Sequence, residues 1–138
     1  MMDAITISND RSLIDFERLG SFIQNAYWGK GRSRQTIQAS FDGSLCFIAM
    51  EQGHQVGFAR VITDYAVLGY ICDVMVFEEH RGRGISKLIM QEILDHPDLG
   101  SVEGFMLATA DAQGLYEQFG FEKVGPDNKY MRLSCVGR

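Results

Sequence analysis

The sequence has few cysteines and no pair of them at a metal-binding or redox spacing. The three that occur, Cys46, Cys72 and Cys135, are an odd number and lie far apart in apolar surroundings. This distribution excludes a disulfide framework and a CxxC metal motif. It favours buried, reduced thiols, which are typical of a cytoplasmic protein. The three histidines are equally dispersed, so we expect no metal site.

Long apolar runs are also missing. No stretch approaches the ~20 apolar residues that span a bilayer. The opening residues, MMDAITISND, lack the basic and apolar regions of a secretion signal. We therefore expect a cytoplasmic protein without membrane contact. No linker or repeat divides the 138 residues, which are enough to bury a core, so residues 1–138 are predicted to form one domain.

Positive charge is in short supply as well. The chain has 13 lysines and arginines against 18 aspartates and glutamates, which gives a formal net charge of -5. This balance argues against nucleic acid as a partner, because nucleic acid usually meets a basic face. An anionic ligand would have to be held by positive charge concentrated at one place.

The period of the apolar pattern changes along the chain and predicts alternating strands and helices. A helix is expected from Leu13 to the glycines Gly29 and Gly31, with Asp10 or Ser12 as its cap. The other expected elements are strands over 4–8, 45–51, 55–63, 66–77, 102–109 and 129–135, and helices over 33–39, from 85 to Pro97, and from Asp111 as cap to Gly120. The order β-α-α-β-β-β-α-β-α-β predicts an α/β (α+β) fold, a mixed sheet with helices on its faces.

The stretch HRGRGISK, residues 80–87, concentrates glycine and positive charge between a strand and a helix. The first turn of a helix has unpaired N–H groups and a positive dipole end. Glycines at Gly82 and Gly84 let a ligand approach the backbone. We therefore predict an anion site for a phosphate ester, with Arg81, Arg83 and Lys87 at its rim. The nucleotide-binding Walker A and GxGxxG motifs are both absent.

Two segments resemble the GNAT superfamily of acetyl-CoA-dependent N-acetyltransferases. The family motif R/Q-x-x-G-x-G/A is filled from Arg81 to Ser86, with serine in place of the final glycine or alanine. A later family motif, N-x-x-A-x-x-L-Y-x-x-x-G-F, is similar to TADAQGLYEQFGF, with Thr109 in place of asparagine. The resemblance covers essentially the whole chain. It implies a mixed, mostly antiparallel central sheet flanked by helices, and acetyl-CoA as acyl donor.

The resemblance also assigns residues to the donor. Backbone N–H groups from Gly82 to Lys87 are expected to hold the pyrophosphate, and the preceding strand to pair with the pantetheine arm. The full set of expected donor contacts is Val74, Met75, Val76, Arg81, Gly82, Arg83, Gly84, Ile85, Ser86, Lys87 and Thr109. The neighbouring strand over 102–109 is expected to splay away and leave a gap for the arm.

Two residues are expected to carry the chemistry. Tyr116 fills the tyrosine of the later motif, and a phenol with a reference pKa near 10 can protonate a leaving thiolate. Asp73 is a carboxylate inside an apolar strand, where an unpaired charge is costly. It either binds or deprotonates the acceptor amine, or is held structurally by Arg60 or a backbone N–H.

The acceptor pocket is expected at the segment AYWGKGRSR, residues 26–34. Tyr27 and Trp28 offer aromatic walls, and Arg32 and Arg34 could attract a carboxylate. The alternative is a helix end with packed aromatics and solvated arginines. If these arginines share a cleft with Asp73, an amino-acid-like or other zwitterionic acceptor is favoured.

The predicted function is transfer of an acetyl group from acetyl-CoA to a primary amine of a small molecule. Two alternatives stay open: acetylation of a protein or peptide amine, and a catalytically inactive coenzyme A-binding sensor. A homodimer is expected from the resemblance alone.

Overall fold

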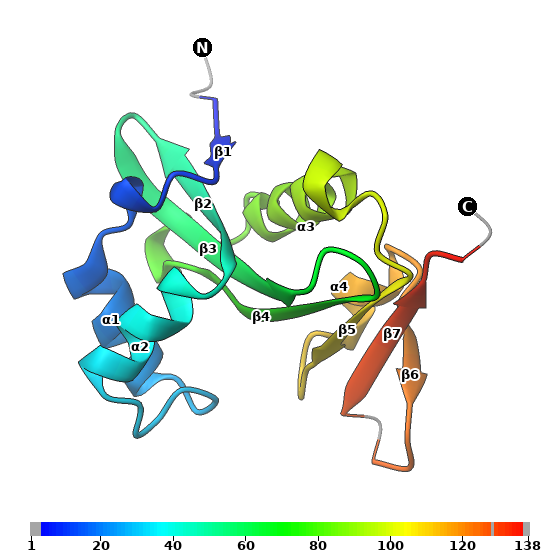
Figure 1. Ribbon diagram of the computed structural model, residues 1–138. Helices are drawn as coiled ribbons and strands as arrows, with labels where there is room; N and C mark the ends of the chain where they lie inside the picture. Colours follow the sequence, from blue (N-terminus) through cyan, green and yellow to red (C-terminus); the bar gives the residue numbers. More distant parts are fainter. Residues whose placement is uncertain (1–3, 128, 137–138) are drawn as a thin grey trace.

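The computed structural model of the protein describes residues 4–127 and 129–136 (Figure 1). Within these residues, seven strands form a single sheet in the order β1-β2-β3-β4-β5-β7-β6. The strands are β1 (Thr6–Ser8), β2 (Leu45–Glu51), β3 (His54–Thr63), β4 (Leu68–Val76), β5 (Gly104–Ala108), β6 (Glu122–Val124) and β7 (Tyr130–Ser134). The α-helices are α1 (Phe16–Asn25), α2 (Arg34–Asp42), α3 (Ile85–Asp95) and α4 (Gln113–Glu117).

The sheet is mixed and mostly antiparallel, which confirms the predicted fold class. Every pairing among the described strands is antiparallel except that of β4 with β5. No helix in the described part of the chain has the length and apolar character to cross a membrane.

Both faces of the sheet are covered, because strand side chains alternate between two apolar clusters. On β2, Phe47 and Ala49 pack with α3 and α4, whereas Cys46, Ile48 and Met50 pack with α1 and α2. Figure 1 shows α1 and α2 on one side of the sheet and α3 on the other. The buried face of α3 has the predicted helical spacing, with Ile85, Ile89, Met90 and Ile93 inside.

The first helix begins later than predicted, and it ends at Asn25, before the glycines Gly29 and Gly31. Asp10 accepts a hydrogen bond from the Ser12 N–H, but it caps only a single 3-10 turn, Arg11–Leu13. Helix α1 starts at Phe16, where the Asp15 carboxylate accepts from the Arg18 N–H. Both aspartates are good N-caps, and the extended backbone of Ile14 separates the two turns.

The prediction that Asp111 caps the last helix is wrong. Ala112 is the N-cap of α4, and its N–H donates to Oγ1 of Thr109 at 3.0 Å. Gly120 adopts a φ of 92°, which confirms the predicted left-handed residue after the helix.

Strand β6 was not predicted. It is only three residues long, carries Glu122 and Lys123, and pairs with β7 at the edge of the sheet. A strand this short has too few residues to show a periodic pattern.

Strand β4 contains a bulge and then separates from β5. Cys72 lies opposite Arg60, and Met75 opposite Phe58, so Asp73 and Val74 together face one residue of β3. Asp73 has a φ of 56°, a left-handed conformation that aspartate tolerates better than most residues. The parallel pairing with β5 ends at Tyr70, although β4 runs on to Val76. The two strands therefore diverge beyond Tyr70.

Candidate functional site

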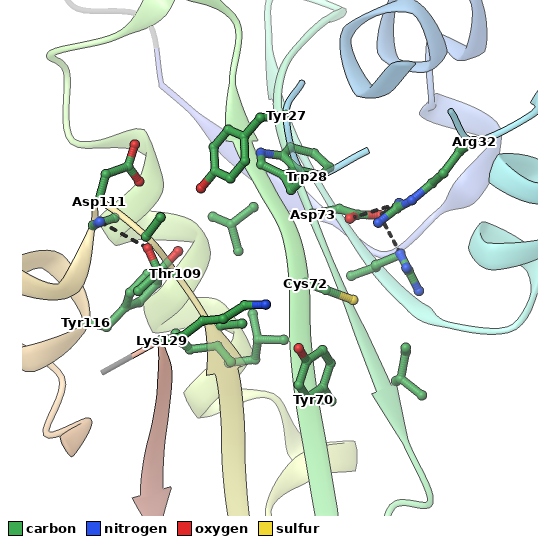
Figure 2. Close-up of a pocket in the computed structure, with 18 residues that line it drawn as sticks. Tyr27, Trp28, Arg32, Tyr70, Cys72, Asp73, Thr109, Asp111, Tyr116 and Lys129 are labelled. Atoms are coloured by element: carbon green, nitrogen blue, oxygen red, sulfur yellow. Dashed lines mark hydrogen bonds and ion pairs between the residues drawn. The ribbon is translucent and has the colours of Figure 1, made fainter. Parts of the chain in front are cut away.

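A cavity of about 570 Å³ lies at the divergence of β4 and β5 (Figure 2). Figure 2 shows Thr109, Asp111 and Tyr116 on one side of β4, and Asp73 with Arg32 on the other. The lining residues come from the α1–α2 connection, β3, β4, β5, the β5–α4 connection, α4 and the position before β7: Tyr27, Trp28, Arg32, Arg60, Ile62, Tyr70, Ile71, Cys72, Asp73, Val74, Leu107, Ala108, Thr109, Ala110, Asp111, Ala112, Tyr116 and Lys129. The topology thus brings together the predicted acceptor residues Tyr27, Trp28 and Arg32 with Asp73 and Tyr116.

Asp73 is held between two guanidinium groups. Its Oδ2 accepts from Nε of Arg60 at 2.6 Å and from Nη1 of Arg32 at 3.0 Å, and its Oδ1 accepts from the same Nη1 at 3.1 Å. The Asp73 side chain is only 1% exposed. The three side chains together carry a net charge of +1. Asp73 therefore has Arg60 as a partner, as expected if its role is structural, which was one of the two roles predicted for it.

Arg60 is fixed on both sides. Its Nη1 donates to Oγ of Ser44 at 3.0 Å while its Nε contacts Asp73. Burial disfavours the charged form of Arg60, but the hydrogen bond and negative charge of Asp73 outweigh burial and raise the pKa of the guanidinium above its ordinary value.

Arg32 is held differently, because it enters the cavity from a loop. Its backbone N–H donates to the Gly29 carbonyl at 3.1 Å, and its carbonyl accepts from Nε2 of Gln24 at 3.0 Å. Its guanidinium lies over the ring of Trp28, 5.7 Å from the centroid. The side chain is 27% exposed, so part of the guanidinium reaches the cavity.

Tyr116 lies on the opposite wall and is 7% exposed. Its ring packs edge-on against Phe121, with centroids 6.1 Å apart. Burial, reinforced by the nearby carboxylate of Asp111, raises the pKa of the Tyr116 phenol to about 12. The phenol is therefore protonated throughout the neutral range.

The glycine corner lies outside the cavity lining. Gly82 and Gly84 have φ of 78° and 77°, and a Cβ at either position would meet no atom within 4 Å. Gly84 is the N-cap of α3. The amide N–H groups of Gly82, Gly84 and the following residues up to Lys87 donate to no acceptor in the described chain. The amides of these residues are therefore unsatisfied, and the backbone is open to a ligand at Gly82 and Gly84.

The positive side chains of this corner are less free than predicted. Arg83 forms a two-pronged ion pair with Glu51 at the end of β2, with Nη1 3.0 Å from Oε1. Arg81 turns back, and its Nε donates to the carbonyl of Val76 at 3.2 Å. Lys87 is exposed on the first turn of α3. The sequence predicted the cluster but not its pairing, because Glu51 is distant in the chain.

Arg34 does not join the cavity. Its Nη2 donates to Oγ of Ser21 and its Nη1 to the Phe16 carbonyl, both in α1. Met75 and Val76 are buried and do not line the cavity, whereas Val74 does. Among the described residues no group of three or more His, Cys, Asp or Glu side chains could hold a metal.

Lys129, Asp111 and Tyr70 are polar lining residues that were not predicted as site residues, and Arg60 was predicted only as a structural partner of Asp73. Asp111 belongs to the segment that resembles the later family motif, and its place in that motif could have identified it as a site residue. Lys129 precedes β7 and reaches the cavity only because β7 pairs with β5. No local pattern distinguishes it.

Known proteins share both the sequence and this architecture. A model of the acetyltransferase (GNAT) domain matches residues 42–123. A crystal structure from Xanthomonas campestris pv. campestris, of a candidate acetyltransferase of the GNAT family, has 42% identity and a TM-score of 0.84, covering 91% of this chain and 88% of that one. A candidate acetyltransferase from Gibberella zeae is 24% identical over 134 residues, which cover 80% of this chain and 74% of its own.

A more distant structure shares the fold. N-acetylglutamate synthase from Neisseria gonorrhoeae, crystallised with coenzyme A and N-acetyl-glutamate, has a TM-score of 0.77 at 15% identity, covering 97% of this chain and 36% of that one. The family model spans more than half of the chain, and the Xanthomonas relative covers nearly all of it at high identity. The chain therefore belongs to the GNAT family of acetyltransferases, enzymes that use acetyl-CoA as acyl donor.

Proposed function

We propose that this enzyme transfers the acetyl group of acetyl-CoA to the primary amine of a small molecule bound in the cavity between β4 and β5. The observation that carries the proposal is one cavity with a protonated phenol, Tyr116, on one wall and the charged group of Arg32, Asp73 and Arg60 on the other. This arrangement can hold an acceptor beside a proton donor.

The glycine corner fits the diphosphate of the donor. Unsatisfied amides at the start of α3, together with the positive end of the helix dipole, suit an anion. Gly82 and Gly84 leave room for it to approach the backbone. Val74 and the β4 backbone beyond Tyr70, which β5 leaves unpaired, suit the pantetheine arm. When bound, acetyl-CoA supplies an activated thioester.

We assign Tyr116 as the general acid. Attack by a neutral amine forms the amide C–N bond and breaks the C–S bond, and the sulfur takes a proton from the Tyr116 hydroxyl. The nitrogen releases its proton to water, and the phenol is reprotonated. With a pKa of about 12, the phenol is protonated at the start of each catalytic cycle and can donate its proton. Thr109 lies on the same wall and fixes the entry to α4 through its hydrogen bond to Ala112.

We assign Asp73 a positioning role rather than that of a base. Both its oxygens already accept hydrogen bonds from guanidinium groups. Protonation of this carboxylate by an amine would weaken both ion pairs inside the protein. Its charge instead holds Arg32 at the cavity.

The small-molecule acceptor is preferred to a peptide because the cavity, at about 570 Å³, has the volume typical of small-molecule sites. An inactive sensor is disfavoured because a phenol in donor form lines that cavity. The cytoplasmic location and the homodimer stay predictions. Free thiols at all three cysteines support the first, and sedimentation velocity tests the second.

The test is thiol release from acetyl-CoA across a panel of primary amines, including peptide N-termini and lysine peptides, alongside thermal unfolding with acetyl-CoA. We expect stabilisation by acetyl-CoA and thiol release with small amines. Release only with peptides would select the peptide alternative. Stabilisation without release from any amine would select the sensor.

A further inference from the structure

The side chain of Arg32, which lines the cavity, has unused hydrogen-bonding capacity. A guanidinium has five N–H donors in a planar fork. Only Nη1 of Arg32 contacts Asp73, and Nε and Nη2 donate to no acceptor within residues 4–127 and 129–136. Nε and Nη2 form one edge of the fork, which is the edge that binds a carboxylate with two parallel hydrogen bonds.

The local charge favours an anion at this edge. Asp73 neutralises only one of the two guanidinium groups, so the buried group keeps a net charge of +1. Arg60 is 9% exposed and its Nε and Nη1 are occupied. Arg32 is the more exposed of the two guanidinium groups that line the cavity, with 27% of its side chain exposed.

The position of Arg32 is fixed before any ligand arrives. Its backbone is hydrogen-bonded at both N–H and carbonyl, its guanidinium stacks near Trp28, and Asp73 holds Nη1. A pre-positioned cation loses little conformational entropy on binding an anion. Such an arrangement is typical of a recognition site rather than a solvated surface arginine.

Resting on the proposed function, we infer that the acceptor is an amine that also carries a carboxylate, and that the Nε–Nη2 edge of Arg32 binds this carboxylate. Arg32 is then a specificity residue, and Asp73 and Arg60 position it. The amine of the same molecule points across β4 toward Tyr116. The acceptor class is an amino acid or a short amino-carboxylic acid, and uncharged amines of the same shape are poor substrates.

The experiment compares matched acceptors that differ only in the carboxylate. Glycine, leucine, phenylalanine, lysine and glutamate are each assayed beside their primary α-amides by thiol release. We expect at least one acid to exceed its amide by about tenfold or more in kcat/KM, the discrimination of a charge-assisted hydrogen bond. Arg32→Gln should remove that preference and Arg32→Lys should restore part of it. Equal or better turnover of every amide by the wild type would overturn the inference while leaving the acetyltransferase function intact.

A matched control uses Lys129, a cation of the cavity lining that is not paired with Asp73. Lys129→Gln removes the same charge from the opposite wall, away from Asp73. It should keep the acid-over-amide preference. Loss of the preference in Lys129→Gln but not in Arg32→Gln would place the carboxylate beside Lys129. That result would overturn the assignment of Arg32 as the carboxylate-binding residue.

A binding measurement keeps the inference testable without turnover. The N-acetyl derivatives of the same amino acids and of their amides are titrated into the enzyme–coenzyme A complex by calorimetry. Preferential binding of an N-acetyl acid, lost in Arg32→Gln, supports the inference. It does so even if no amine releases thiol, because the absence of thiol release counts only against the proposed function. Equal affinity for the N-acetyl acids and their amides contradicts the inference that Arg32 binds a carboxylate.

Discussion

Nε of Arg60 lies 2.6 Å from Oδ2 of Asp73, across the β3–β4 pair at the bulge of β4. The bulge places two residues opposite one and lets Asp73 adopt a left-handed backbone. Without the bulge, the regular alternation of side chains along β4 would point the Asp73 side chain in another direction. This single contact links the irregularity of the sheet to the charge at the cavity.

Replacing Asp73 by asparagine should destabilise the protein and weaken acceptor binding. The variant leaves Arg60 buried without its counter-charge, so we expect a loss of about 2 kcal/mol or more in the free energy of unfolding. Released Arg32 should raise the acceptor KM more than it lowers kcat. Denaturant unfolding and steady-state kinetics measure the two effects.

Asp42→Asn is the control for that variant. Asp42 pairs with Arg11 at 3.7 Å on the surface, where its side chain is 61% exposed. Loss of this pair should change stability by less than about 0.5 kcal/mol. If Asp73→Asn instead abolished kcat at unchanged acceptor KM, Asp73 would be the base and the positioning role would be wrong.

Tyr116→Phe should lower kcat by about 100-fold, the range of a lost general acid, and leave acetyl-CoA affinity unchanged. The ring and its packing against Phe121 persist in phenylalanine. Calorimetric titration with acetyl-CoA and single-turnover kinetics separate binding from chemistry. An unchanged kcat would remove Tyr116 from the mechanism.

The pH dependence provides a second test of Tyr116. Burial raises its pKa to about 12, so the phenol stays protonated up to about pH 11. The ratio of wild-type to Tyr116→Phe turnover should therefore be constant from pH 7 to 10. A ratio that falls within this window would mean that the phenol ionises earlier than its burial predicts. Because the folded pKa is raised, the stability due to this group is complete below about pH 10 and is lost as the pH rises toward 12.

Gly84→Ala should weaken acetyl-CoA binding by about tenfold. A Cβ meets no atom there, so the effect comes from the φ of 77°, which disfavours alanine by about 1–2 kcal/mol and turns the amides away. Thermal shift and calorimetric titration with acetyl-CoA report the change.

Gly53→Ala serves as the matched control for this loop. Gly53 has a φ of 78° and equally open surroundings, but it lies in the β2–β3 turn. Its substitution should lower stability by a similar amount and leave acetyl-CoA affinity unchanged. Equal affinity in both variants would argue against a diphosphate at the α3 corner.

Cys72 lines the cavity but should be a poor nucleophile. Burial raises the pKa of its thiol to about 11. Roughly 0.1% is then thiolate at pH 8, against about a quarter for a free cysteine. Alkylation by iodoacetamide, followed by peptide mass spectrometry, should be roughly 200-fold slower than for a free thiol. Rapid labelling of Cys72 at pH 8 would contradict this pKa.

The strong local patterns predicted most of the fold. The hairpin of β2 and β3, the apolar strand β4 and the face of α3 all follow from residue periodicity over seven or more positions. Strand β6 and the late start of α1 escaped prediction because short or interrupted elements give no such repeat. The two motif segments identified the family because they combine residue type with spacing.

The chain sequence by itself determined most of the elements, the glycine corner before α3 and the presence of Tyr116 and Asp73. Only the tertiary structure decided that Arg60 and Arg32 share Asp73, that Arg83 pairs with Glu51, and that Arg34 points away. Asp73 is 13 positions from Arg60 and 41 from Arg32 in the sequence, and Arg83 is 32 positions from Glu51. Such contacts depend on how strands register and where one bulges, and neither is encoded in a local pattern.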